Sequence, residues 1–287
     1  MLSNEFTNYL SNLIGSKIIR IKSVSGGDIS AAYTLETSKS KFFLKVNSKP
    51  WALDMFQVEA QGLTAINNSK TIATPEIIAY DTFKNASCLI IEFVESKLAT
   101  SKDLELFGSQ LAQLHQVTTD EFGFANDNFI GSLHQSNNKH KNWNDFYIEE
   151  RLNPQFELAR SKGLLIDDEI PETQELKEAC FSYFNNVKPS LLHGDLWSGN
   201  YLISVSGRPY LIDPAIYFGH SEVDIAMSQL FGGFGTSFYE SYHTIITKDE
   251  NTEIRIELYQ LYYLLIHLNL FGSSYYGSVK GILSKYF

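Results

Sequence analysis

The chain has 287 residues, of which 44% are hydrophobic and 20% charged, and its 23 basic and 33 acidic residues leave a net charge of −10. This composition is that of a folded globular protein and not of a disordered chain. The acidic balance argues against a general binder of nucleic acids or anionic membranes, because such partners repel a negative surface. A local pocket for one anionic ligand stays compatible with it.

The acidic surplus is confined to the second part of the chain. Residues 1–95 contain 9 basic and 9 acidic side chains, whereas residues 96–287 contain 14 and 24. The length suits one large domain or two lobes. We expect an N-terminal lobe over residues 1–95 and a C-terminal lobe over residues 96–287.

Nothing at the start of the chain predicts a targeting segment, because Glu5 interrupts any basic-then-apolar layout. The longest apolar runs, at 89–94 and 258–270, are interrupted or too short to span a bilayer. Cys88 and Cys180 are far apart and show no paired spacing, so we expect two free thiols. We therefore expect a cytoplasmic monomer without membrane or nucleic-acid partners.

The first part of the chain reads as an antiparallel sheet with one inserted helix. Alternating or aromatic and β-branched runs predict five strands, and a longer run between the third and fourth predicts a helix. The strands are expected at Lys17–Ser23, Ala31–Glu36, Lys41–Val46, Ile77–Tyr80 and Ser87–Phe93, and the helix at Met55–Asn67. This pattern predicts a small α+β lobe.

After Glu95 the pattern becomes mainly helical. Thr100 and Asp103 have the spacing of a capping box, and apolar residues follow from Leu104 at helical spacing. Further helices are expected at Asp145–Lys162, Pro171–Asn185, Val223–Leu230 and Ile254–Phe271. Between them, residues 191–219 are non-helical, and two short apolar runs around Ser206–Pro209 predict a hairpin.

The segment His193–Asn200, with the sequence HGDLWSGN, carries the strongest chemical signal. Phosphoryl transfer from ATP needs a carboxylate near the acceptor hydroxyl, oxygen ligands for Mg²⁺ and positive charge on the phosphates. Asp195 and Asn200 are spaced as the catalytic-loop Asp and Asn of protein kinases are. Asp213 lies on the far strand of the predicted hairpin, so Asn200 and Asp213 are predicted to share one Mg²⁺.

The first lobe offers partners for ATP. Lys45 lies in the middle of an apolar strand, and Glu59 on the following helix is a candidate ion-pair partner. The pair would place Lys45 against the phosphates; the alternative is a surface lysine.

Two backbone segments complete the predicted ATP site. Gly26 and Gly27 lie in the turn between the first two strands, where they permit close approach to phosphate, although the motif is incomplete and Asp28 would repel phosphate. Glu92, Phe93 and Val94 would offer backbone groups to adenine; the alternative is the end of a buried strand.

With these residues in view, the chain resembles the fructosamine kinase (ketosamine-3-kinase) family, which has a protein-kinase-like fold related to aminoglycoside phosphotransferases and choline kinases. The resemblance runs from about residue 23 to the end of the chain and rests on FFLKVN, IIEFVE, GSQLAQLH, FGFANDNFIGS, LLHGDLWSGN, LIDPAIYFGHSEVDIAM, LFGGFGTSFYESYH and YQLYYLLIHLN. Trp197 and the run Gly219–Glu222 separate this family from its relatives.

The resemblance implies ATP-dependent phosphorylation of O3 of a fructosamine or ribulosamine, which destabilises the adduct and repairs a glycated amine. It implies that Asp195 positions or deprotonates the sugar hydroxyl, that Asn200 and Asp213 hold Mg²⁺, and that Lys45 holds the phosphates. Asp213 is followed by Pro214 and not by the Phe-Gly of protein kinases, so no mobile activation loop is expected.

The sequence permits two interpretations of the role of several further residues. Trp197 either stacks on a sugar or packs in the core, and His220 either contacts substrate or is structural. Asp224 and His115 are read as braces of the catalytic loop. Phe231–Phe234 either lines the acceptor pocket or forms a packing turn, and Trp143 is read as core.

Two rival functions remain open. One is a different small-molecule kinase of the same fold, acting on an aminoglycoside or on a choline-like or homoserine-like acceptor. The other is a non-catalytic pseudokinase, whose expected mark is the loss of Lys45, Asp195, Asn200 or Asp213; the chain retains all four.

Overall fold

The computed structural model describes residues 2–24 and 29–287, and their contacts divide the chain into two compact units. The first unit is Met1–Leu98 with Leu202–Asp213, and the second is Ala99–Tyr201 with Pro214–Phe287. A segment late in the sequence therefore belongs to the first unit. The boundary expected after Glu95 stays a prediction.

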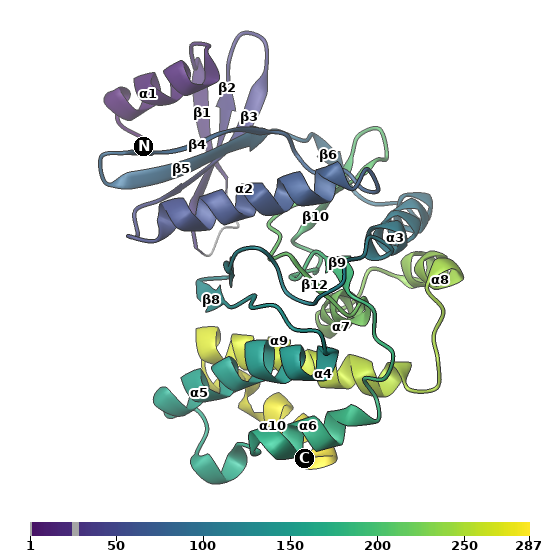
Figure 1. Ribbon diagram of the computed structural model, residues 1–287. Helices are drawn as coiled ribbons and strands as arrows, with labels where there is room; N and C mark the ends of the chain where they lie inside the picture. The colour runs from purple at the N-terminus through teal and green to yellow at the C-terminus, as the bar shows by residue number, and fades with distance from the viewer. Residues whose placement is uncertain (1, 25–28) are drawn as a thin grey trace. The chain divides into compact units, whose positions relative to one another are not determined.

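A five-stranded antiparallel sheet forms the centre of the first unit (Figure 1). Its strands lie in the order β1-β2-β3-β5-β4, and helix α2 (Ala52–Asn68) separates β3 from β4 in the sequence. The strands are β1 (Arg20–Val24), β2 (Ala31–Glu36), β3 (Lys41–Asn47), β4 (Ile77–Phe83) and β5 (Ala86–Glu92). The predicted sheet and its inserted helix are confirmed.

Each face of this sheet is covered by a different helix. Side chains alternate between the two faces of a strand, so Leu44 and Lys45 point to opposite sides. Leu44 packs in a buried cluster with Phe6 and Leu10 of helix α1 (Asn4–Ile14), whereas Lys45 reaches Glu59 of α2. The strands between the two helices are therefore buried on both faces, as the largely apolar sequence of β5 requires.

The predicted hairpin is also present. Strand β10 (Tyr201–Ser204) precedes β11 (Pro209–Leu211), and β10 pairs with the short strand β6 (Ser96–Lys97). The amide of Leu211 donates to the carbonyl oxygen of Ala73 at 2.9 Å, which anchors the end of the hairpin within the first unit.

The second unit is mainly helical, as predicted. Its capping box at Thr100 and Asp103 is confirmed. Its α-helices are α3 (Ser101–His115), α4 (Trp143–Phe146), α5 (Asn153–Ser161), α6 (Thr173–Phe181), α7 (Glu222–Leu230), α8 (Thr236–Ile245), α9 (Thr252–Phe271) and α10 (Tyr276–Tyr286). Two short strand pairs, β7 (Asn128–Ile130) with β8 (Leu133–Gln135) and β9 (Ser190–Leu192) with β12 (Tyr217–Gly219), complete the unit.

The helix expected at Asp145–Lys162 is instead a succession of α4, a π-helix (Tyr147–Leu152) and α5. Pro154 lacks an amide hydrogen and its ring clashes with the carbonyl of the residue four positions earlier, Glu150. A wider turn relieves this clash, and the Glu150 carbonyl accepts a hydrogen bond from Arg151 Nη1 at 3.0 Å instead. The predicted helical segment is therefore present, and the π-helical stretch within it is the feature that the sequence analysis did not predict.

Helix α9 forms the centre of the second unit, with most of its residues buried. Helices α3 and α8 approach each other very closely at Gly108, where a Cβ would overlap the backbone carbonyl of Phe238. In the part of the chain that the structure describes, no helix combines the length and apolar character needed to cross a membrane.

Candidate active site

The first unit brings together Lys45, Glu59 and Asp213. Lys45 Nζ lies 2.7 Å from Glu59 Oε1 and also contacts Asp213 Oδ1. The side chains of Lys45 and Glu59 are 13% and 11% exposed, whereas that of Asp213 is 41% exposed. The predicted ion pair of Lys45 with Glu59 is therefore present, and Asp213 keeps a carboxylate face open to solvent.

The cluster of Lys45, Glu59 and Asp213 contains one basic and two acidic side chains. Burial disfavours the Lys45 ammonium, but the two carboxylates outweigh burial and raise the pKa of Lys45 above its ordinary value. Burial, together with the neighbouring charge of Asp213, raises the pKa of Glu59 against the opposing effect of Lys45. One ammonium is thus shared by two carboxylates, and a cation bound at Asp213 would relieve their repulsion.

Asp213 occupies an uncommon backbone conformation. It follows β11 with a φ of 55°, in the left-handed region that residues other than glycine rarely adopt. Such conformations cost on the order of 1–3 kcal/mol and cluster at functional sites. Asp213 lies two residues after Leu211, where the hairpin is anchored to Ala73, and its carboxylate contacts Lys45.

The second unit brings together Asp195 and Asn200. The Nδ2 group of Asn200 donates to the Asp195 backbone oxygen at 2.8 Å and to Asp195 Oδ2 at 3.1 Å. Because the amide nitrogen is turned to Asp195, the amide oxygen is the atom that can ligate a cation. Asn200 and Asp213 belong to different units, so their shared Mg²⁺ site stays a prediction. The carboxylate and amide oxygens offered are nevertheless the hard ligands that Mg²⁺ prefers.

Asp224, at the start of α7, holds the loop that carries Asp195. Its carboxylate accepts from the amides of His193 at 2.7 Å and Gly194 at 2.8 Å, and it lies 3.1 Å from His115 Nε2. Burial opposes ionisation of Asp224, but these donors lower its pKa below the ordinary value. The predicted bracing of the loop by Asp224 is confirmed, and His115 contacts the Asp224 carboxylate.

The same loop is fixed at Gly194 from two further sides. Gly194 has a φ of 85°, and a Cβ there would overlap the carbonyl oxygen of Ala215. The Tyr263 hydroxyl of α9 donates to the Gly194 carbonyl at 2.9 Å. Tyr263 lies within the motif YQLYYLLIHLN, where nothing in the sequence distinguishes it from the neighbouring tyrosines.

The segment after Pro214 is also held rigidly. Asn128 Nδ2 donates to the Ile216 carbonyl at 2.7 Å, and Gln135 Nε2 donates to the Ala215 carbonyl at 3.2 Å. These buried bonds hold Ala215 and Ile216 in place; that no mobile activation loop follows Asp213 stays a prediction.

The two candidate substrate residues lie in different surroundings. Trp197 is 39% exposed and lies against Gly199, so it is not a core residue. His220 is 15% exposed, and its Nδ1 lies 2.8 Å from the Tyr259 hydroxyl. Burial lowers the pKa of His220 to about 4, so its ring is neutral near pH 7.

The remaining predicted contacts concern the ATP base and phosphates. Glu92 ends β5, and its amide donates to the Glu76 carbonyl at 2.8 Å. Phe93 and Val94 follow directly, and Lys41 Nζ lies 5.7 Å from the centre of the Phe93 ring. Gly26 and Gly27 lie outside the described residues.

Comparison with known proteins identifies close relatives over nearly the whole chain. A sequence profile described as fructosamine kinase matches residues 2–287. The ketosamine-3-kinase of Mus musculus is 36% identical over 90% of this chain and 92% of its own length. The chloroplastic protein-ribulosamine 3-kinase of Arabidopsis thaliana is 39% identical over 94% of this chain and 83% of its own length.

Solved structures of other proteins are also similar to this chain. A candidate fructosamine-3-kinase from Haemophilus somnus superposes with a TM-score of 0.89 at 27% identity, covering 98% of this chain and 96% of that one. The aminoglycoside phosphotransferase APH(4)-Ia superposes with a TM-score of 0.63 at 16% identity over 99% of both chains, which shows the shared protein-kinase-like fold alone. The predicted fold class is therefore confirmed.

Proposed function

Because the chain belongs to the fructosamine kinase family, we propose that it transfers the γ-phosphoryl group of ATP to O3 of a ketosamine, such as a ribulosamine or fructosamine. The observation that carries this proposal is the hydrogen-bonded pair of Asp195 and Asn200 on a loop held by buried Asp224. The family match over residues 2–287 supplies the acceptor class.

On the ATP side, the Lys45 ammonium contacts the phosphates and Glu59 keeps it oriented. Asn200 and Asp213 would hold Mg²⁺, which when bound neutralises developing phosphate charge. Backbone groups of Glu92–Val94 would contact adenine, and Gly26 and Gly27 would approach the phosphates.

On the acceptor side, the Asp195 carboxylate orients the sugar hydroxyl and accepts its proton. The new bond joins the sugar oxygen to the γ-phosphorus, while the bond from that phosphorus to the bridging oxygen of ADP breaks. Catalysis rests on positioning and charge neutralisation, as is usual for phosphoryl transfer. The exposed ring of Trp197 offers a stacking surface for the sugar or its amine linker, and His220 is a further candidate contact.

The product, a ketosamine 3-phosphate, would release the free amine and so reverse glycation. We propose that this repair takes place in the cytoplasm and that the protein is a monomer. Burial raises the pKa of the Cys88 thiol to about 11 and that of Cys180 to about 12, so both thiols are protonated and unreactive near neutral pH.

The test is an acceptor panel. Purified protein with ATP and Mg²⁺ is incubated with ribulosamine and fructosamine adducts of lysine, and ADP release and phosphorylated product are quantified. An aminoglycoside, choline and homoserine are assayed alongside. We expect product from the ketosamines alone; phosphorylation of another acceptor in their place would favour the rival kinase activity.

Asp195→Asn should lower kcat by roughly 1,000-fold or more while leaving ATP binding intact, because it removes the base and orienting charge. Asp168→Asn, at an exposed aspartate in the same unit, is the matched control and should keep wild-type turnover. ATP-dependent turnover near the wild-type rate in Asp195→Asn would contradict the assignment. Calorimetric titration of the variants with ATP separates lost binding from lost chemistry.

A further inference from the structure

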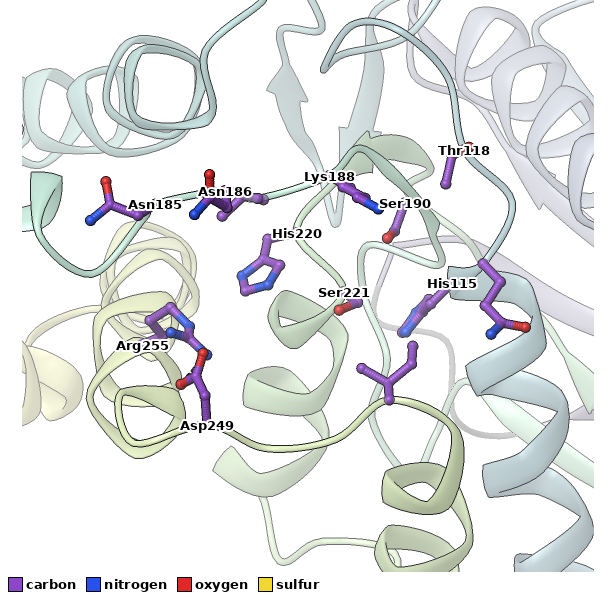
Figure 2. Close-up of a pocket in the computed structure, with 13 residues that line it drawn as sticks. His115, Thr118, Asn185, Asn186, Lys188, Ser190, His220, Ser221, Asp249 and Arg255 are labelled. Atoms are coloured by element: carbon purple, nitrogen blue, oxygen red, sulfur yellow. Dashed lines mark hydrogen bonds and ion pairs between the residues drawn. The ribbon is translucent and has the colours of Figure 1, made fainter.

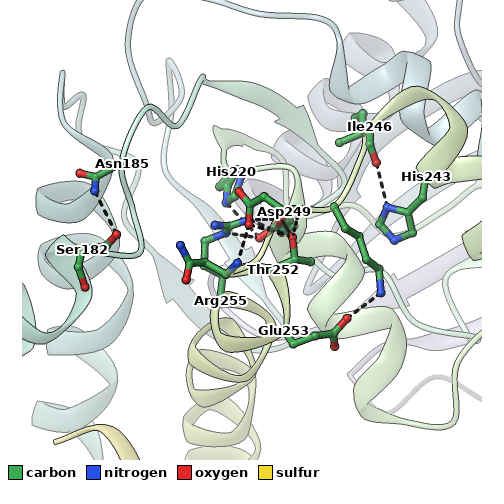
Figure 3. Close-up of polar contacts among 12 residues, drawn as sticks. Ser182, Asn185, His220, His243, Ile246, Asp249, Thr252, Glu253 and Arg255 are labelled. Carbon is green, nitrogen blue, oxygen red and sulfur yellow. Dashed lines mark hydrogen bonds and ion pairs between the residues drawn. The ribbon is translucent and has the colours of Figure 1, made fainter.

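Two cavities of this protein differ in the charge of their walls. The larger one, of about 650 Å³ in the second unit, is drawn in Figure 2. Its basic wall residues are Lys188 and Arg255, and Arg255 forms ion pairs with Glu222 and Asp249 (Figure 3). These two acidic charges cancel the two basic ones, so this wall does not select a charged ligand.

A smaller cavity in the first unit has a positively charged wall. Its volume is about 360 Å³, at the lower end of the range of small-molecule sites. It is lined by Asn67, Asn68, Lys70, Thr71, Ile72 and Arg208. Lys70 and Arg208 are basic and the other four residues are uncharged, so the wall carries two positive charges.

The backbone on both sides of this cavity is fixed. Helix α2 ends at Asn68, and Lys70 then turns the chain with a φ of 57°, in the left-handed region that commonly follows a helix. The β10–β11 hairpin is held against the segment after this turn, because the Ala73 carbonyl accepts from the Leu211 amide at 2.9 Å. Arg208, in the turn of that hairpin, is thereby kept across the cavity from the end of α2.

The polar side chains of the wall are available to a ligand. Across residues 2–24 and 29–287, no carboxylate forms an ion pair with Lys70 or Arg208, and the side-chain amides of Asn67 and Asn68 make no hydrogen bond. The Arg208 guanidinium lies over the Tyr210 ring, 5.5 Å from its centre, which restricts its orientation. Two like charges at one cavity repel each other, and an anion between them would remove that repulsion.

The C-terminal end of α2 does not cancel this positive charge. Unpaired carbonyls at the end of a helix carry partial negative charge, which disfavours an anion. Here the carbonyls of Ile66 and Asn67 accept from the amides of Ser69 and Lys70, both at 3.1 Å, and the Ser69 hydroxyl also donates to the Ile66 carbonyl. These carbonyls are therefore occupied, and the full charges of Lys70 and Arg208 outweigh the dipole that remains.

We propose that this cavity binds a phosphate group, either as the free ion or as the monoester of a small molecule. A phosphate monoester has a charge close to −2 at neutral pH and three acceptor oxygens, which match two cations and two amides. The planar Arg208 guanidinium would donate to two of the oxygens, and the Lys70 ammonium and the amides of Asn67 and Asn68 would contact the others.

This site is separate from the proposed ATP site, because neither Lys45 nor Asp213 lines it. Glu59, the partner of Lys45, lies eight residues before Asn67, which is about 12 Å along α2. The proposal therefore does not depend on the kinase activity.

The asparagine amides give a readout that is local to this cavity. Protein labelled with ¹⁵N-asparagine is titrated with inorganic phosphate, and separately with glycerol 3-phosphate, up to about 20 mM at constant ionic strength, a range that detects weak sites. We expect saturable movement of the side-chain resonances of Asn67 and Asn68, which Asn67→Ala and Asn68→Ala assign.

The two probes distinguish the sources of the phosphate group. A response to both shows that the phosphate group itself is recognised, a response to inorganic phosphate alone indicates the free ion, and a response to glycerol 3-phosphate alone indicates a monoester. Acetate, which has a single negative charge, should bind at least about tenfold more weakly than the responding phosphate. Equal binding of acetate would overturn the assignment to phosphate.

Lys70→Met and Arg208→Met should each weaken phosphate binding about three- to tenfold, because each removes one charge-assisted contact at an exposed position. Lys39→Met is the matched control, at another exposed lysine of the first unit that has no ion-pair partner among the described residues, and it should leave the titration unchanged. No saturable movement with either phosphate probe, an unchanged titration in Lys70→Met or Arg208→Met, or an equal weakening in Lys39→Met would each overturn the proposal.

Discussion

Gly194 directly precedes Asp195, which carries the proposed catalytic carboxylate. The carbonyl oxygen of Gly194 accepts a hydrogen bond from the Tyr263 hydroxyl. The amide of the same residue donates to Asp224, so both backbone polar groups of Gly194 are held by side chains, from α7 and α9 respectively. Small displacements of the reacting groups lower the rate of phosphoryl transfer, because the reaction depends on their alignment. We therefore expect Tyr263 to act as a positioning residue for Asp195.

Tyr263→Phe removes only this hydroxyl and leaves the Gly194 carbonyl without its donor. We expect a loss of about 1–2 kcal/mol in the free energy of unfolding and a roughly tenfold lower kcat, with an unchanged KM for ATP. Urea denaturation and steady-state kinetics measure the two effects. Tyr276→Phe, which removes an exposed hydrogen bond to Glu169, is the control. A wild-type kcat in Tyr263→Phe would refute the positioning role.

His220 makes the stability of the second unit depend on pH. Its pKa is about 4 in the folded protein and its ordinary value is 6.5, so the unfolded chain binds the proton more readily between these values. The stabilisation is complete above the ordinary pKa and is lost as the pH falls toward the folded value.

From about pH 7.5 to about pH 5, His220 should account for a loss of about 2 kcal/mol in the free energy of unfolding. His220→Gln should remove this part of the pH dependence, whereas His134→Gln, at a largely exposed histidine, should not. Urea unfolding at both pH values provides the measurement. Equal pH slopes in the wild type and His220→Gln would be inconsistent with a buried neutral ring.

At the scale of elements, the sequence predicted the sheet, its inserted helix and the hairpin because each has strong local periodicity and turn residues. It also predicted the Lys45–Glu59 pair, since both residues lie on regular elements one connection apart. Helix α1 was missed although Phe6 and Leu10 are spaced as a buried face. Tyr263 was missed for another reason: several tyrosines of α9 are buried, and only the tertiary packing decides which one meets the catalytic loop.

Gly108 controls the approach of α3 to α8. Gly108→Ala should lower the free energy of unfolding by at least about 2 kcal/mol, because the added methyl overlaps the Phe238 carbonyl and forces the helices apart. Gly281→Ala is the matched control within α10, where a Cβ meets no described atom within 4 Å. It should stabilise the protein by about 0.5–1 kcal/mol through helix propensity. The denaturant midpoints of the two variants provide the measurement. Equal changes in the free energy of unfolding would contradict the close packing at Gly108.

At the scale of the whole molecule, the sequence separated a neutral first part from an acidic second part of net charge −10. The neutral part carries Lys45, whose ammonium suits a nucleotide. The acidic part carries Asp195 and suits an amine-bearing acceptor. Where the chain returns from the second unit to the first was not predictable in this way, because Leu202–Asp213 is defined by long-range contacts such as Leu211 with Ala73.

The position of Leu202–Asp213, late in the sequence but within the first unit, has a consequence for folding during synthesis. Domains generally fold as they leave the ribosome, N-terminal part first. Here the first unit lacks Leu202–Asp213, and with it one carboxylate partner of Lys45, until more than two thirds of the chain has been made. Until Asp213 has been synthesised, Glu59 is the carboxylate partner available to Lys45. The nascent first unit therefore emerges without Asp213, so the ATP chemistry proposed for Lys45 and Asp213 has to await the synthesis of this later segment.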